Sequence, residues 1–150
     1  MICSNEMIRQ AGREDSSLLA SFGVQVFSGS ASEDLEKEFA ELAEQEDAAC
    51  FIKYIGETPV GFAQCGLRHD YVEGTKTSPV GYLEGIFVLP QYRGRDYGAE
   101  LLSSCENWAR EKGCTEFASD CGLSNYDSLS FHLAVGFEEA NRIICFRKTI

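Results

Sequence analysis

Apolar residues recur with two different periods along this chain, and each change of period marks a change from strand to helix. A short strand is predicted over residues 7–11, followed by helical spacing of apolar residues in 13–27. A second helix is predicted over residues 32–47, where acidic residues crowd the first turn. Residues 48–71 form two β-like runs around a turn that contains Gly56, which predicts a hairpin.

The second half of the chain continues with alternating strands and helices after a polar connection at residues 70–79. The elements that the pattern predicts are a strand over 80–89 that Pro90 ends, a long helix over 97–113, a short strand over 115–119, a helix over 125–135 and a last strand over 142–148. Polar connections of this length often carry binding residues on a rigid scaffold.

Length and composition indicate one ordinary globular domain, residues 1–150. The chain is 44% hydrophobic and 25% charged, and it contains no apolar run near the roughly 20 residues that cross a bilayer. Its first residues also lack a basic region followed by a long apolar one. We therefore expect a cytoplasmic protein with no membrane partner.

The cysteines argue against both a zinc site and a disulfide framework. Seven cysteines form no CxxC pair, and two histidines are too few to complete a metal site by the usual spacing. An odd number of cysteines, scattered over predicted helices and strands, indicates reduced thiols within a core. The sequence thus predicts no metal.

The formal net charge of -11 bears on the choice of partner. Phosphate backbones and anionic membranes attract basic surfaces, so the charge disfavours nucleic acid and favours a cationic ligand. Alternatively, the net negative charge serves only to keep the protein soluble. The charge therefore does not identify a ligand until a binding site is located.

The segment after Pro90 has the composition of an anion-binding turn. Gly94 and Gly98 permit sharp backbone turns, so that several N–H groups point into one concavity at a helix N-terminus. Arg93 and Arg95 add positive charge there, which suits phosphate or pyrophosphate. An ordinary strand-to-helix turn with exposed arginines is the alternative. Neither of the common nucleotide-binding patterns, GxxxxGK[ST] or GxGxxG, is present.

The stretch "GIFVLPQYRGRDYGAELL" resembles the acyl-coenzyme A binding segment of the GNAT acetyltransferase superfamily, whose signature is Gln/Arg-x-x-Gly-x-Gly/Ala. Gln91 and Gly94 match that signature. "NYDSLSFHLAVGF" is similar to the late helix of the superfamily, and residues 65–148 resemble the aminoglycoside 6'-N-acetyltransferases in particular.

This resemblance implies an α/β (α+β) GNAT acyl-CoA N-acyltransferase fold, with a central mixed, mostly antiparallel sheet flanked by about four helices. It also implies acetyl-CoA as co-substrate, an aminoglycoside or other polycationic amine as acceptor, and a homodimer. The residues that it assigns to the coenzyme are Ile86, Phe87, Val88, Gln91, Arg93, Gly94, Arg95, Asp96, Tyr97, Gly98, Ala99 and Asn125. The backbone amide of Val88 is further expected to stabilise the oxygen of the reacting carbonyl.

Asp96 departs from the family signature, which prefers glycine at this position. A carboxylate beside pyrophosphate would repel it, so we expect the Asp96 side chain to turn away and to cap the following helix.

Glu84 is the main candidate for amine chemistry. Strict alternation along the strand would set it on one face with Tyr82, Ile86 and Val88, where an unpaired carboxylate is costly. It then either binds within the protein or faces a substrate cation. The resemblance favours the second alternative, with amine binding and proton removal by Glu84.

The resemblance assigns three more residues to the aminoglycoside. Asp120 ends the short strand and is expected to face ammonium groups, Tyr71 lies in the polar connection, and Phe27 follows the first predicted helix. An acidic cleft of Glu84, Asp120 and loop acids would attract a polycation and would make affinity depend on salt. In this interpretation the basic turn takes phosphate and the carboxylates take amine.

Two points of mechanism stay open at the level of sequence. His132 stands where many superfamily members have a tyrosine that protonates the leaving thiolate, so it is either that acid or a packing residue. Cys114 and Cys121 are possible nucleophiles, but no histidine and acid can be paired with them, so direct transfer is expected. The alternatives for function are an acetyltransferase for polyamines or other small amines and a non-catalytic acyl-CoA sensor.

Overall fold

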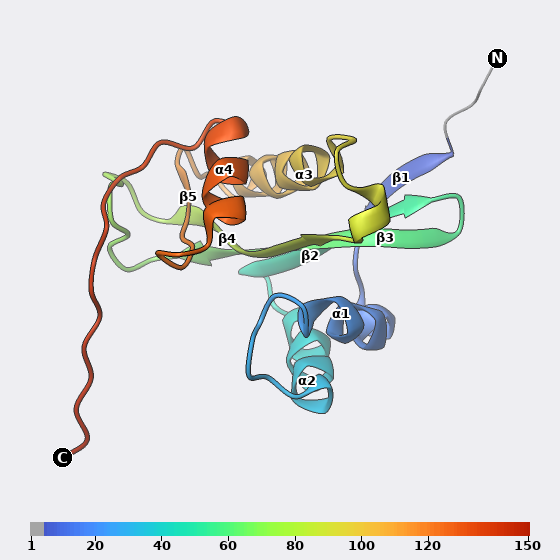
Figure 1. Cartoon of the computed structure of the whole chain (residues 1–150), viewed down its shortest axis with the longest axis horizontal. Helices are drawn as coiled ribbons and strands as arrows, with labels where there is room; N and C mark the ends of the chain where they lie inside the picture. Colours follow the sequence, from blue (N-terminus) through green and yellow to red (C-terminus); the bar gives the residue numbers. More distant parts are fainter. Residues whose placement is uncertain (1–4) are drawn as a thin grey trace.

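The computed structural model describes residues 5–150, and its framework is one five-stranded sheet with the strand order β1-β2-β3-β4-β5 (Figure 1). The first three neighbouring pairs are antiparallel, and β4 and β5 are parallel. The strands are β1 Glu6–Gln10, β2 Ala48–Ile55, β3 Thr58–Arg68, β4 Val80–Val88 and β5 Phe117–Ser119. The expected mixed, mostly antiparallel sheet is thus confirmed.

Four α-helices cover the two faces of this sheet. Helices α1 (Ser16–Gly23) and α2 (Ser32–Leu42) lie on one face, and α3 (Tyr97–Glu111) and α4 (Tyr126–Ala134) lie on the other (Figure 1). Short 3-10 helices precede α1 and follow β4, at Arg13–Asp15 (η1) and Pro90–Tyr92 (η2). Among residues 5–150, no helix is long and apolar enough to cross a bilayer.

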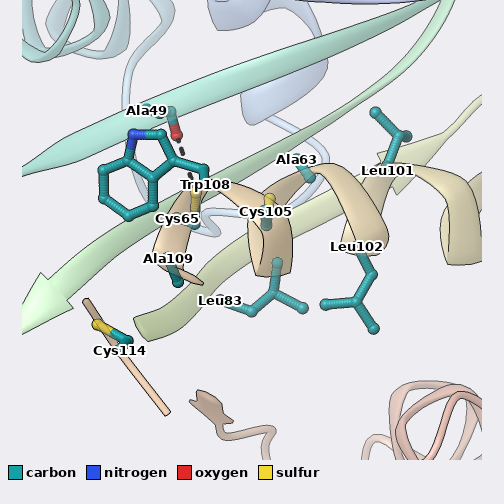
Figure 2. Packing of buried hydrophobic residues seen from close by; sticks show 10 residues of the cluster. All are labelled: Ala49, Ala63, Cys65, Leu83, Leu101, Leu102, Cys105, Trp108, Ala109 and Cys114. Carbon is teal, nitrogen blue, oxygen red and sulfur yellow. Dashed lines mark hydrogen bonds between the residues drawn. The ribbon is translucent and has the colours of Figure 1, made fainter. Parts of the chain in front are cut away.

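Each face of the sheet has its own hydrophobic core. On the α3 side, Cys65, Leu83 and Cys105 lie with Leu101 and Trp108 between the helix and the sheet (Figure 2). On the other side the core is aromatic; its ring contacts join Phe22, Phe39, Phe62 and Phe87. Four of the six cysteines that the structure describes are buried, and Cys121 and Cys145 are exposed. Cys3 lies outside the described residues.

Both helices of the first half are shorter than the sequence predicts. Helix α1 ends at Gly23, and the chain continues through a turn in which the amides of Val26 and Phe27 both donate to the Gly23 carbonyl oxygen, at 2.9 and 2.8 Å. Helix α2 ends at Leu42 and not at residue 47. The turn after α1 carries Phe27 back to the sheet, where it packs against the aromatic core.

The predicted last strand over residues 142–148 is not formed. Residues 137–150 follow α4 without helix or strand; the first of them contact β5 and the polar connection, and the end of the segment runs away from the body of the molecule (Figure 1). The exposed fraction of Phe146 is 90%, and Ile143 and Ile144 are also exposed. The apolar pattern of this segment suits a strand, but a strand requires a neighbour to pair with, and within one copy the segment has none.

A buried lysine joins β1, β2 and α3. The Lys53 ammonium is 2% exposed and donates to Glu6 at 3.2 Å and to Glu100 at 2.9 Å. It also lies 4.6 Å from the centre of the Tyr97 ring, whose hydroxyl donates to Glu6. Burial alone would lower the pKa of Lys53, but the hydrogen bonds to Glu100 and Glu6 raise it. This cluster fixes the first turn of α3 against the sheet.

Candidate active site

Glu84 stands at a β-bulge in the middle of β4. Gln64 pairs with Gly85 and Cys65 pairs with Leu83, so Glu84 is an extra residue with no partner of its own in the β3–β4 register. Bulges of this kind redirect side chains and are common beside active sites.

The bulge overturns the expectation that Tyr82, Glu84, Ile86 and Val88 share one face. Leu83, Ile86 and Val88 pack on the α3 core, although strict alternation would set Leu83 opposite the other two. Tyr82 and Glu84 both contact the guanidinium of Arg68 on the other side of the strand. The extra residue thus removes Glu84 from the apolar surroundings that alternation predicts.

Arg68, the last residue of β3, binds both oxygens of Glu84. Its Nη2 donates to Oε1 at 2.8 Å and to Oε2 at 2.9 Å, and its Nε donates to Oε2 at 3.1 Å. Its guanidinium also stacks on the Tyr82 ring, 3.9 Å from the ring centre. The side chain of Arg68 is 44% exposed and that of Glu84 is 28% exposed, so solvent reaches this ion pair.

Asp120 also has a partner within the protein, the hydroxyl of Tyr82, which donates a short hydrogen bond to its carboxylate. Burial and this carboxylate raise the pKa of Tyr82, so the phenol stays protonated and remains a donor. Asp120 itself is exposed, directly after β5. The two predicted amine-binding carboxylates therefore lie around one tyrosine, with Arg68 as a cation beside them.

Phe27 and Tyr71 lie in very different surroundings. A Cβ atom on Gly85 would be 2.7 Å from Cζ of Phe27, so this ring packs directly on β4 beside the bulge. Tyr71 is 75% exposed in the polar connection. With Arg68, Tyr82 and Asp120 it lines a cavity of about 970 Å³ that runs along β5. The structure brings Phe27 beside Glu84 and leaves Tyr71 at the edge of the cavity.

Strands β4 and β5 separate after a short paired stretch. The last paired residues are Leu83 and Ser119, and β4 then continues to Val88 without a β5 partner in the register. Ile86, Phe87 and Val88 are still paired to β3 on their other side. The predicted coenzyme residues of β4 therefore lie where one edge of the strand faces away from β5.

The turn between β4 and α3 contains most of the other predicted coenzyme residues. Gly94 has a left-handed φ of 79°, and nothing lies within 4 Å of the position that a Cβ would take. Arg93 bends back, donates to the Val88 carbonyl oxygen at 2.8 Å and stacks on Phe87. Gln91 and Arg95 are exposed. The turn is open on its outer side, and the positively charged residues Arg93 and Arg95 lie directly before and after Gly94.

Asp96 occupies the N-cap position of α3, but its side chain makes no capping hydrogen bond, so that expectation is wrong. The residue has a left-handed φ of 64°, the conformation for which the family signature uses glycine, and aspartate is among the few residues that tolerate it. The backbone, not the side chain, explains why the signature has glycine here.

Tyr97, Gly98 and Ala99 form the first turn of α3. The Tyr97 side chain is buried against Lys53, which leaves only its backbone to a ligand. A Cβ on Gly98 would be 2.9 Å from the Phe131 ring, so this glycine allows α3 and α4 to approach closely. Ala99 is half-buried. Gly98 thus has a packing role that the sequence did not reveal.

Helix α4 begins as predicted. Asn125 is its N-cap, and its side-chain oxygen accepts a hydrogen bond from the amide of Ser128. His132 lies at the separation of β4 and β5; its Nδ1 donates to the Ser128 carbonyl oxygen at 2.6 Å, and its Nε2 lies 2.8 Å from the Ser119 hydroxyl. Its ring also packs on Phe137. Both ring nitrogens are thus engaged within the protein.

The two cysteines considered as nucleophiles differ in exposure. Cys114 is buried, and burial raises the pKa of its thiol, which disfavours the reactive thiolate. Cys121 is exposed and lines the cavity.

Arg68, Tyr82 and Ser119 are site residues that the sequence did not single out as partners. Arg68 precedes the polar connection by one residue, and no local pattern links it to Glu84. Their proximity arises from the β3–β4 and β4–β5 registers, which only the folded sheet defines.

Comparison with known proteins agrees with this geometry. The family model for the acetyltransferase (GNAT) family matches residues 17–137. Aminoglycoside N(6')-acetyltransferase type 1 of Stenotrophomonas maltophilia is 43% identical, over 98% of this chain and 95% of its own length.

Two solved structures have the same fold over nearly the whole chain. AAC(6')-Iy in complex with CoA matches with a TM-score of 0.94 and 36% identity, over 99% of this chain and 98% of that one. AAC(6')-Iy in complex with the bisubstrate analog CoA-S-monomethyl-acetylneamine matches with a TM-score of 0.92 and 36% identity, over 98% of this chain and all of that one. The chain therefore belongs to the GNAT acetyltransferase family, in the group of the aminoglycoside N(6')-acetyltransferases of type 1.

Proposed function

We propose that this protein transfers the acetyl group of acetyl-CoA to the 6'-amine of aminoglycoside antibiotics, by direct transfer in a ternary complex. One observation carries the proposal: strand β4 bears an acidic bulge at Glu84, a free edge from Ile86 to Val88 and, just beyond its end, an open basic turn. An amine and an acylated nucleotide can therefore meet along one strand.

The coenzyme is assigned to the free edge and the turn. Backbone donors of Ile86, Phe87 and Val88 can pair with an extended amide-containing arm as a further strand would. The open turn around Gly94, with the N-terminus of α3 behind it, suits pyrophosphate. Asn125, at the start of α4, is assigned to the far side of the same ligand.

The acceptor is assigned to Glu84 and Asp120, with Phe27 beside Glu84 and Tyr71 at the edge of the cavity. The attacking amine must be neutral, so a proton leaves it either to Glu84 directly or through water. The amine nitrogen then attacks the thioester carbon, the amide of Val88 stabilises the oxygen, the nitrogen loses its second proton to solvent, and the C–S bond breaks to give the amide and the thiolate. Solvent supplies the proton to sulfur, because His132 is engaged within the protein at both ring nitrogens.

A thiol-release assay with acetyl-CoA tests this proposal against its alternatives. We expect release with kanamycin or tobramycin and much less with spermidine, and Glu84→Ala should abolish most of it. Preference for the polyamine would indicate a polyamine acetyltransferase. Binding of acetyl-CoA by calorimetry without thiol release from any amine would indicate a sensor and contradict the proposal.

We also infer that two copies form a dimer by exchanging their C-terminal segments. The apolar residues 143–146 lie on both faces of the extended segment, which suits a strand that is covered on both sides. Beyond Phe137, whose ring contacts Phe117 of β5, residues 138–143 line the cavity and do not pair with that strand. The match to AAC(6')-Iy with CoA covers 99% of this chain, and this range includes the extended segment. The match therefore supports the extended path of residues 137–150.

Size-exclusion chromatography with light scattering tests the exchange. Phe146→Asp should convert a dimer to a monomer, because a charge would enter a covered strand. Lys148→Asp, two residues away on the same side of the segment, is the matched control and should stay dimeric. A monomeric unmodified protein would contradict the exchange.

We assign the protein to the cytoplasm. The six cysteines of residues 5–150 are free thiols, which suits a reducing compartment.

A further inference from the structure

The Glu84 carboxylate is already occupied by a cation of the protein itself. Arg68 gives three hydrogen bonds to its two oxygens, so both acceptor atoms on which an ammonium group would bind are in use. Three of the roughly four lone-pair sites of this carboxylate are taken and its charge is balanced, so a substrate ammonium competes with the guanidinium for Glu84.

The pair is built so that it can open. Its two side chains are 44% and 28% exposed, so water can compete for both partners and screens the ion pair, although its bidentate geometry places it at the upper end for exposed pairs, about 1 kcal/mol. By contrast, the buried ammonium of Lys53, 2% exposed between Glu6 and Glu100, has no comparable freedom. Arg68 therefore differs from the structural ion pair on the other side of the sheet.

A second acid lies within reach of the released guanidinium. The carboxylate of Asp120 contributes to the raised pKa of Arg68; Arg68 stacks on the face of the Tyr82 ring, and the hydroxyl of the same ring donates to Asp120. Arg68 can turn about the Tyr82 ring while its charge stays close to a carboxylate. The cost of its release from Glu84 is thereby reduced.

We propose that Arg68 is a resident cation of the amine site: its guanidinium occupies Glu84 in the free enzyme, and an ammonium group of the substrate displaces it. This inference rests on the proposed function, and it makes Arg68 a residue that sets amine affinity. While Arg68 is bound, the guanidinium and Glu84 form an ion pair that an incoming ammonium group must break. Once the guanidinium has left, the amine nitrogen lies directly on the carboxylate that can take its proton.

The displacement has two measurable consequences. Loss of the competing cation should tighten aminoglycoside binding by about fivefold, the upper range for a solvent-exposed ion pair. Binding should also become more sensitive to salt. In the unmodified protein, binding breaks the ion pair of Arg68 with Glu84 and forms one between the substrate and Glu84. Salt weakens both pairs, so its effects on the binding free energy partly cancel. Without Arg68, salt weakens only the pair that forms on binding.

Arg68→Gln and Arg68→Lys separate charge from shape. Gln keeps donors without the charge, and Lys keeps the charge without the bidentate fork. The exposed pair of Arg13, in η1, with Glu44, just after α2, is 3.1 Å apart and supplies the matched control Arg13→Gln. Kanamycin affinity would be measured by calorimetry without coenzyme at low and high salt, and kcat and KM by thiol release.

We expect Arg68→Gln to lower the kanamycin Kd and KM about fivefold with a steeper salt dependence. Arg68→Lys and Arg13→Gln should stay near the unmodified protein in both respects. A raised or unchanged Kd in Arg68→Gln overturns the inference, since Arg68 would then bind the substrate or orient Glu84. If Arg68→Gln loses its folded structure by circular dichroism, the salt dependence of Arg68→Lys decides: a steeper slope than in the unmodified protein overturns the inference.

These outcomes separate the inference from the proposed function. An active unmodified enzyme whose Arg68→Gln variant binds no more tightly rejects only the role of Arg68. An unmodified protein that neither binds kanamycin nor releases thiol rejects both.

Discussion

The basic turn after β4 and the acidic site at its bulge are built in different ways. The turn owes its form to the backbone: Gly94 and Asp96 both have left-handed φ values, and the side that faces outward at Gly94 is open. The acidic site consists of side chains from three strands and a connection, and its two carboxylates already have protein partners in Arg68 and Tyr82. The turn is therefore open as it stands, whereas in our proposal the acidic site exchanges partners when an amine binds.

Substitution of Glu84 gives the largest expected effect and tests whether the two sites are independent. Glu84→Gln should lower kcat/KM for kanamycin about 100-fold, because the amide can neither pair with ammonium nor accept its proton. The Kd for acetyl-CoA, measured by calorimetry, should not change. A parallel loss of acetyl-CoA affinity would show that the acidic site and the turn act as one unit.

Gly94→Ala tests the preformed turn. A Cβ strains the left-handed conformation by about 1 kcal/mol, and relaxation of the turn should weaken acetyl-CoA binding about tenfold. Gly113→Ala is the matched control: its φ is 92°, it also has open space around it, and it lies just beyond the other end of α3. Equal affinity losses in the two variants would mean that strain alone, not the turn, governs binding.

His132→Gln tests whether the ring at the β4–β5 separation takes part in chemistry. Because its nitrogens bind Ser128 and Ser119, we expect turnover to fall only about threefold, well below the hundredfold or more of a lost general acid. Steady-state thiol release measures this. A larger fall, together with loss of a titration near neutral pH from the kcat profile, would make His132 the acid.

Asp96→Gly should have the smallest effect, and a favourable one. Glycine adopts the left-handed conformation at φ 64° without the strain of a side chain, so the free energy of unfolding should rise by up to about 1 kcal/mol in urea titration. Acetyl-CoA affinity should stay equal or improve as a carboxylate leaves the turn. A marked loss of affinity would show that Asp96 contributes to the ligand.

Local features of the sequence predicted most of the fold and the position of the turn. The hairpin, the β4 strand and helices α3 and α4 are where the pattern predicts them, because periodicity, glycine and proline act over a few neighbouring residues. The ends of α1 and α2 were less well predicted, since the packing of Gly23 and Phe27 against other elements decides where α1 stops.

What the sequence by itself determined is the order of elements, the positions of the turns and the residue types of the site. What only the tertiary structure decided is pairing: the bulge that turns Glu84 toward Arg68, the hydroxyl of Tyr82 on Asp120, the engagement of His132, and the failure of residues 142–148 to form a strand within one copy. Each of these depends on which residue of a distant segment lies opposite. That register is set by the packing of the whole sheet, and it cannot be predicted from the residues that are neighbours in sequence.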